Sequence, residues 1–190
     1  VQDLVDYCAA NPNSLIFGMQ LGSASHYYAE NCKQNLGITW NYVETGSGDT
    51  ARITAIMGNI IEATTVNGAQ ALQYVEAGEV KALCSLTTAG GTVPDALKGI
   101  PSLEDCGYDN ITVDNVNFLY GPVMDDALCE AINQTFTKIF NDTDVQQQLL
   151  DLNQEQELCE DYAQATEMVN SLYDSYRSVA ESLGVLAPGM

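Results

Sequence analysis

The chain has 190 residues, 46% of them hydrophobic, and its six Lys and Arg residues against 26 Asp and Glu residues give a formal net charge of -20. This length and hydrophobic content are enough for a packed core and exclude a disordered chain. The acidic balance excludes nucleic-acid and anionic-membrane binding, because both depend on basic patches. No apolar run approaches the length of about 18 residues that a membrane span needs.

Short apolar runs alternate with amphipathic segments in the first part of the chain. The expected helices are 2–10, 24–36, 49–58 and 67–77, and the expected strands are 15–18, 39–43, 60–63 and 80–85. This alternation predicts an α/β fold with a mostly parallel sheet. Right-handed crossovers then place helices on both faces of the sheet.

The pattern changes after Pro122. Before it, Pro101 and Gly107 bound a short predicted helix, and 116–120 is a predicted strand. After it only helices are expected: 127–140, one capped by Asp142 or Thr143 and ending at Leu150, and one capped by Asp161 and ending at Leu183. An apolar stripe predicts the buried face of the last helix: Tyr162, Met168, Val169, Leu172, Tyr176, Val179 and Leu183. We therefore expect an α/β ligand-binding lobe over 1–115 and a crossover strand with C-terminal helices over 116–190.

Three loops, each following a predicted strand and opening a predicted helix, are rich in small and hydroxyl-bearing residues. The candidate ligand-binding residues are Gly22, Ser23, Ala24, Ser25 and His26 in the first loop, Thr45, Gly46, Ser47 and Gly48 in the second, and Thr65 in the third. A helix start leaves about four backbone N–H groups unpaired and carries a partial positive charge, so such loops can hold an anion without a lysine. Ligands of open parallel sheets bind at this edge, beyond the carboxyl ends of the strands.

Each of these residues also has a structural interpretation. Ser23 and Ser25 either bind a ligand carboxylate or cap the helix, and the second loop either surrounds an anion or forms a tight turn. Arg52 either faces solvent, pairs with a carboxylate or contacts a ligand. His26 adjoins two serines, but neighbouring helical positions point in different directions, which favours a packed or surface histidine over a catalytic base.

Neither a metal site nor a cofactor is expected. The six cysteines form no C-x-x-C pair and the chain has one histidine. We therefore interpret most of the cysteines as buried free thiols.

Several further motifs follow one another in a fixed order. They are Asn11-Pro12, the first loop from Leu21 to His26, Gly37-Ile38, Ile56-Met57-Gly58, Ala77-Gly78 with Lys81-Ala82-Leu83, the segment from Ile100 to Tyr108, and Tyr120-Gly121-Pro122. In this order they resemble the tripartite tricarboxylate transporter solute-binding receptors, also called the TctC or Bug family. The second loop departs from the family pattern, since Glu44 and Asp49 add negative charge to it.

The resemblance implies a non-catalytic, two-lobed receptor similar to type II periplasmic binding proteins. Such a receptor closes on a small carboxylate and passes it to a membrane permease, in the periplasm or at the cell surface. By this resemblance the chain is the second lobe plus the returning C-terminal helices, and it lacks the N-terminal part of the first lobe. Without that part, the surface that it covers in the family would be exposed, and we expect this exposed surface to promote self-association of the chain.

No signal-like segment follows Val1, so targeting information would lie upstream. Two other functions stay open at this point. One is an α/β enzyme that acts on an acyl or phosphoryl substrate with His26 as base. The other is an interaction module without a ligand.

Overall fold

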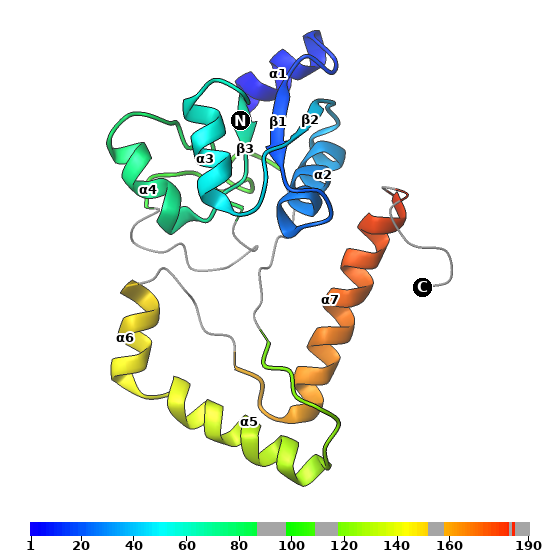
Figure 1. The fold of residues 1–190 in the computed structure, drawn as a ribbon, viewed down its shortest axis with the longest axis vertical. Coiled ribbons are helices and arrows are strands. Elements are labelled where there is room, and N and C mark those ends of the chain that lie inside the picture. The colour runs from blue at the N-terminus through cyan, green and yellow to red at the C-terminus, as the bar shows by residue number, and fades with distance from the viewer. Residues whose placement is uncertain (87–97, 109–117, 152–157, 183, 185–190) are drawn as a thin grey trace. The chain divides into compact units, whose positions relative to one another are not determined.

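The computed structural model describes residues 1–86, 98–108, 118–151, 158–182 and 184. The chain divides into two compact units, of which the first includes the described residues up to Tyr108 and the second runs from Phe118 to Ser182 (Figure 1). The predicted boundary at 115/116 lies outside the described residues. The assignment of the two parts to two lobes of a receptor stays a prediction.

The first unit is built on a parallel three-stranded sheet. Its strands are β1 (Ile16–Met19), β2 (Asn41–Glu44) and β3 (Ala63–Thr64), in the order β2-β1-β3. Met19 lies beside Glu44, and Gly18 lies beside Thr64. The three consecutive residues from Phe17 to Met19 are all buried, as expected for a central strand that is covered on both faces.

Four helices accompany the sheet: α1 (Gln2–Ala10), α2 (Ala24–Leu36), α3 (Asp49–Met57) and α4 (Gly68–Glu76). From β1 the chain moves through α2 to β2, and it then returns through α3 to β3 on the other side of β1. Because right-handed crossovers are the rule, this reversal puts α2 and α3 on opposite faces of the sheet, as Figure 1 shows. The predicted α/β class with a parallel sheet and helices on both faces is confirmed.

The main core of the first unit lies where α1 and α2 meet the sheet. Aromatic rings from two strands and the segment before β2 fill its centre: Phe17 stacks on Trp40 with ring centroids 4.6 Å apart, and Tyr42 meets both rings edge-on. The buried members of this core are Cys8, Leu15, Phe17, Ala29, Cys32, Ile38, Trp40, Ala63 and Leu103. Two of the six cysteines are buried and the other four are half-buried, and all are free thiols.

The predicted strand 80–85 is wrong. Gly78 takes a positive φ of 72°, and the amide of Glu79 donates to the carbonyl of Tyr74. The residues directly after α4 therefore form the C-terminal cap of that helix. Only Ser85 pairs with another segment, in an isolated parallel bridge to Ser102. A strand needs a neighbour along its length, and within the described part of the chain residues 80–84 have none.

The predicted short helix between Pro101 and Gly107 is a hydrogen-bonded turn instead. It begins as a helix would, since the Ser102 hydroxyl accepts from the amide of Asp105. It ends almost at once, because Gly107 takes a φ of 85° and the amide of Tyr108 donates to the carbonyl of Leu103. The described part of the predicted strand 116–120, residues 118–120, forms no strand, and 116–117 lie outside the described residues.

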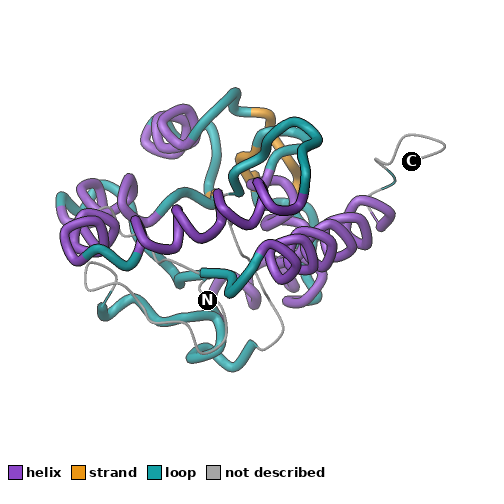
Figure 2. Tube along the Cα trace, turned by 90° about the horizontal axis from the view of Figure 1, so that it is seen from below, coloured by secondary structure: helices purple, strands orange, loops and turns teal. Residues whose placement is uncertain are grey.

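The second unit contains three helices, α5 (Asp126–Phe140), α6 (Thr143–Asp151) and α7 (Tyr162–Ser182). The predicted caps are present, because Asp142 accepts from the amide of Asp144 at 3.0 Å and Asp161 accepts from the amide of Gln164 at 2.8 Å. Strands occur only in the first unit among the described elements, as Figure 2 shows. The predicted change to helices alone after Pro122 is confirmed for this part.

The apolar stripe of α7 is less buried than predicted. Met168, Val169, Leu172, Tyr176 and Val179 are half-buried, Tyr162 is 42% exposed, and Leu183 lies outside the described residues. No residue of α5 or α6 is buried, and in the described part of α7 Ala180 is the one buried residue. The described helices of this unit therefore enclose no core of their own. No helix in the described ranges is both long enough and apolar enough to cross a membrane.

A buried charged network joins α2 to β2. Glu30 is buried, and its carboxylate accepts a hydrogen bond of 2.7 Å from the Tyr42 hydroxyl and pairs with the Lys33 ammonium at 2.5 Å. Burial alone would raise the pKa of Glu30, but the hydrogen bonds from Lys33 and Tyr42 and the charge of Lys33 together lower it below its ordinary value. Burial and the hydrogen bond to Glu30 raise the pKa of Tyr42.

We expect Glu30→Gln to lower the free energy of unfolding by about 1 kcal/mol at neutral pH, because it removes the charged partner of two half-buried donors, Lys33 and Tyr42. A lowered pKa stabilises the fold fully above the ordinary carboxyl value of 4.5, and this contribution is lost as the pH falls through the lower folded value. Urea unfolding from about pH 7 to pH 3.5 should therefore show the difference between wild type and variant shrinking below about pH 4.5. A difference that does not change with pH would contradict this account.

Candidate functional site

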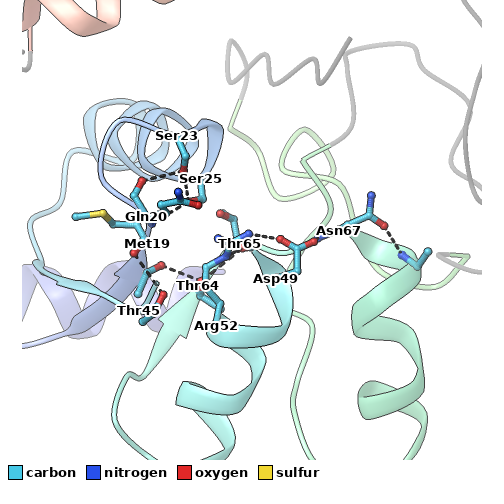
Figure 3. A network of polar contacts seen from close by, with 12 residues as sticks. Met19, Gln20, Ser23, Ser25, Thr45, Asp49, Arg52, Thr64, Thr65 and Asn67 are labelled. Atoms are coloured by element: carbon cyan, nitrogen blue, oxygen red, sulfur yellow. Dashed lines mark hydrogen bonds and ion pairs between the residues drawn. The ribbon is translucent and has the colours of Figure 1, made fainter. Parts of the chain in front are cut away.

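The carboxyl ends of the three strands are tied together by two threonines. The Thr64 hydroxyl donates to the carbonyl of Gly18 at 2.8 Å. Thr45 donates to the carbonyl of Met19 through its amide at 3.0 Å and its hydroxyl at 3.3 Å. The three predicted loops therefore start from fixed points at one edge of the sheet, and Figure 3 shows the polar network that they form.

In the first loop the serine hydroxyls hold the loop itself. Ser23 is the N-cap of α2, but its side chain does not cap the helix and donates instead to the carbonyl of Gln20 at 2.8 Å. Ser25 is 5% exposed, accepts from the amide of Gln20 at 3.1 Å and lies 2.8 Å from the Ser23 hydroxyl. The helix start stays uncapped by a side chain, and the amides of Ala24 and Ser25 have no hydrogen-bond partner in the described part of the chain.

His26 is a packed histidine. It is buried, its Nδ1 accepts from the amide of Gly22 at 3.3 Å, and its ring meets the Tyr42 ring edge-on with centroids 5.3 Å apart. These contacts account for both its position and its orientation. They do not pair it with a serine hydroxyl, as a nucleophile–base mechanism requires.

In the second loop Gly46 and Gly48 have φ values of 88° and 85°, a conformation that side-chain-bearing residues rarely adopt. The Gly46 amide is not open to a ligand, because it donates to the Glu44 carboxylate at 3.1 Å. The other oxygen of that carboxylate accepts from the amide of Leu21 in the first loop at 2.6 Å. Sequence reasoning noted the charge of Glu44 but missed this bridge, which the pairing of Met19 with Glu44 makes possible.

The third loop is held by Arg52, which is 6% exposed. Its Nε donates to the carbonyl of Thr65 at 2.9 Å, and its guanidinium pairs with Asp49. Asp49 also accepts from the amide of Asn67 at 2.9 Å. Of the three interpretations of Arg52, pairing with a carboxylate is the one observed.

Thr65 differs from the other hydroxyl-bearing residues of the three loops. Its Oγ1 is buried and has no hydrogen-bond partner within the described residues. A buried hydroxyl without a partner costs about 1–3 kcal/mol, so it is a position where a ligand or water would add a bond. Thr65 follows β3, the neighbour of β1, where the strand order reverses, and ligands of open α/β sheets bind at such a reversal.

The structure does not gather all the predicted residues into one hollow. A surface hollow of about 560 Å³ lies beside the second loop, where Val43, Glu44, Thr45, Thr50, Ala51, Thr54, Ala55 and Ile60 line it. It contains Thr45 but no predicted residue of the first or third loop. Gly22, Ala24, Gly46, Ser47 and Gly48 are exposed, and Ser23, Thr45 and Thr65 are half-buried. In the described ranges no cluster of His, Cys, Asp and Glu is arranged to hold a metal ion.

Comparison with solved structures identifies the fold. The chain is similar to Rpa4515 of R. palustris, solved with adipate, with a TM-score of 0.73 and 18% identity over 97% of this chain and 60% of that one. It is also similar to the periplasmic binding protein BugD, with a TM-score of 0.72 and 16% identity over 97% of this chain and 62% of that one. The fold is thus that of periplasmic binding proteins, and the chain spans about three fifths of the length of these structures.

The family follows from a direct match. Residues 1–183 match the model of the tripartite tricarboxylate transporter family receptor, TctC, so the chain belongs to this family of solute-binding receptors. A TctC solute-binding protein from Polaromonas, solved without ligand, has a TM-score of 0.67 and 15% identity over 95% of this chain and 61% of that one. No protein with a curated function matches the chain. The family resemblance inferred from the motifs is confirmed, and the family and these neighbours are non-catalytic receptors of extracytoplasmic solutes.

Proposed function

We propose that this protein is an extracytoplasmic receptor that captures a small carboxylate by lobe closure and delivers it to the membrane permease of a tripartite tricarboxylate-type transporter. The residues of this chain supply one wall of the binding site, at the carboxyl edge of the sheet. Family membership over residues 1–183 supports the receptor role, and the adipate in the R. palustris structure supports the ligand class.

The observation that carries the ligand class is the uncapped start of α2 beside the unpartnered hydroxyl of Thr65. The amides of Ala24 and Ser25 have no partner among the residues described, and β1 and β3, which lead into these two loops, are paired neighbours. Backbone amides at a helix start favour an anion, and hydrogen bonds to a charged group are the stronger kind. In this proposal Ser23 and Ser25 shape the first loop, and the amides of Ser47 and Gly48 are further donors from the second.

The experiment is calorimetry and thermal unfolding of the protein as its gene encodes it, with straight-chain carboxylates of four to six carbons. A carboxylate of the right class should raise stability by about 2.7 kcal/mol when present at about 100 times its Kd. No stabilisation by any member of the panel would overturn the proposed ligand class.

A single variant tests the placement of the site. Thr65→Val removes a hydroxyl that has no partner in the described structure, so the free protein should keep its stability while binding weakens by about 0.5–1.5 kcal/mol. The matched control is Thr135→Val in α5, where the hydroxyl donates to the carbonyl of Ala131 at 2.7 Å. If the Thr65 variant binds the ligand as tightly as the wild type, the ligand does not contact Thr65 and the proposed placement of the site is wrong.

A further inference from the structure

Glu44 occupies the position that a ligand carboxylate would take between the first two loops. Its Oε2 accepts from the amide of Leu21 at 2.6 Å, and its Oε1 accepts from the amide of Gly46 at 3.1 Å. Each oxygen thus binds the backbone of a different loop. A two-oxygen contact to backbone amides is how an anion is held at such a place, and here the anion belongs to the protein.

In the third loop, too, a carboxylate of the chain engages groups that could otherwise bind a ligand. One oxygen of Asp49 pairs with Arg52 and the other accepts from the amide of Asn67 at 2.9 Å. The one cation among these loop residues and three of their amides are therefore engaged by carboxylates of the chain. In the described first loop, the amides of Ala24 and Ser25 at the start of α2 still have no hydrogen-bond partner.

These contacts favour one ligand carboxylate at this edge of the sheet over two. The Leu21 amide, which belongs to the same loop as the amides of Ala24 and Ser25, is already engaged by Glu44. A second ligand carboxylate beside this bridge would meet the negative charge of Glu44, and the two amides of the bridge, those of Leu21 and Gly46, are already engaged. Glu44 is exposed in this chain, so water weakens the repulsion, but two like charges in contact repel each other even in water.

We propose that Glu44 is a specificity-determining residue, which restricts this wall of the site to one ligand carboxylate and favours a neutral or hydrogen-bond-donating group beside it. The inference rests on the proposed function and narrows its substrate class. The ligand is then a monocarboxylate with a polar, uncharged second group, such as an amide or a hydroxyl.

The test compares matched ligand pairs, each a dicarboxylate of four to six carbons and its monoamide, by calorimetry on the protein as its gene encodes it. The wild type should bind the monoamide of the preferred length at least tenfold more tightly than the dicarboxylate. Glu44→Gln should reduce that ratio at least fivefold, chiefly through tighter binding of the dicarboxylate. Glu44→Asp keeps the charge and should keep the preference, which separates the effect of charge from that of shape.

The matched control is Glu62→Gln. Glu62 also accepts from a backbone amide of β1, that of Ile16 at 2.9 Å, but at the opposite end of the strand, so its loss should leave the ratio unchanged. Thermal unfolding of each free variant checks the fold. Binding with no preference for the monoamide, or with a preference that Glu44→Gln does not alter, would overturn this inference alone. Absence of binding by every compound would overturn the proposed function itself.

Discussion

Replacing Arg52 by methionine is expected to lower the free energy of unfolding by about 3 kcal/mol, the lower end of the range for breaking a buried ion pair. The guanidinium is buried, pairs with Asp49 and donates to the carbonyl of Thr65, so the variant loses both contacts at once. The lower end applies because the Asp49 side chain is 17% exposed and keeps some access to water. Methionine preserves the apolar stem, and urea unfolding at neutral pH measures the loss.

The control is Arg177→Met in α7. Arg177 pairs with Glu181 at 3.0 Å, but both side chains are exposed, and exposed pairs contribute little to stability. This variant should unfold like the wild type within error. Equal losses for the two arginine variants would show that the burial of Arg52 does not determine its contribution.

Replacing Gly18 by alanine is expected to lower the free energy of unfolding by about 1–3 kcal/mol, as overpacking of a core does. A Cβ at this position would lie 2.3 Å from Cδ1 of Ile61 and 3.0 Å from Cγ2 of Thr45. Ile61 is 2% exposed, so its side chain has no free space into which to move. Because the same methyl group presses on Thr45, the second loop should shift as well.

A double variant separates the clash from other effects of Gly18→Ala. Ile61→Val removes the methyl group that the new Cβ would meet first, so it should cost stability alone but recover part of the loss when combined with Gly18→Ala. Chemical unfolding of the four proteins gives the interaction energy of the pair. Strictly additive losses would contradict the packing explanation.

Features set by neighbouring residues could be predicted from the sequence. Asp142 and Asp161 mark helix starts, and Gly37, with a φ of 64°, ends α2 where the pattern placed its end. The parallel sheet also followed from the alternation of short apolar runs with helices. In each case the physical cause, a capping bond or a periodic apolar face, lies within a few residues of its effect.

Features set by distant partners could not be predicted in this way. Residues 80–84 have the composition of a strand, but only pairing with another segment makes a strand, and in the described structure Ser85 alone is paired. The bridge made by Glu44 depends on the register of β2 against β1, and the burial of Arg52 depends on how the third loop packs over α3. The sequence predicted the loops as a candidate site, while the partners of their amides could be seen only in the fold.

The threonine bonds at the strand ends bear on how such a protein diverges. Thr64 and Thr45 attach to main-chain carbonyls of β1, and any residue at those carbonyl positions offers the same acceptor. Substitution in the loop tips therefore leaves the attachment points in place. The attachment of the loops to the sheet therefore depends on main-chain acceptors of β1, which fits a fold shared with neighbours at 15–18% identity. Over evolution the residues at the loop tips can change while the sheet persists.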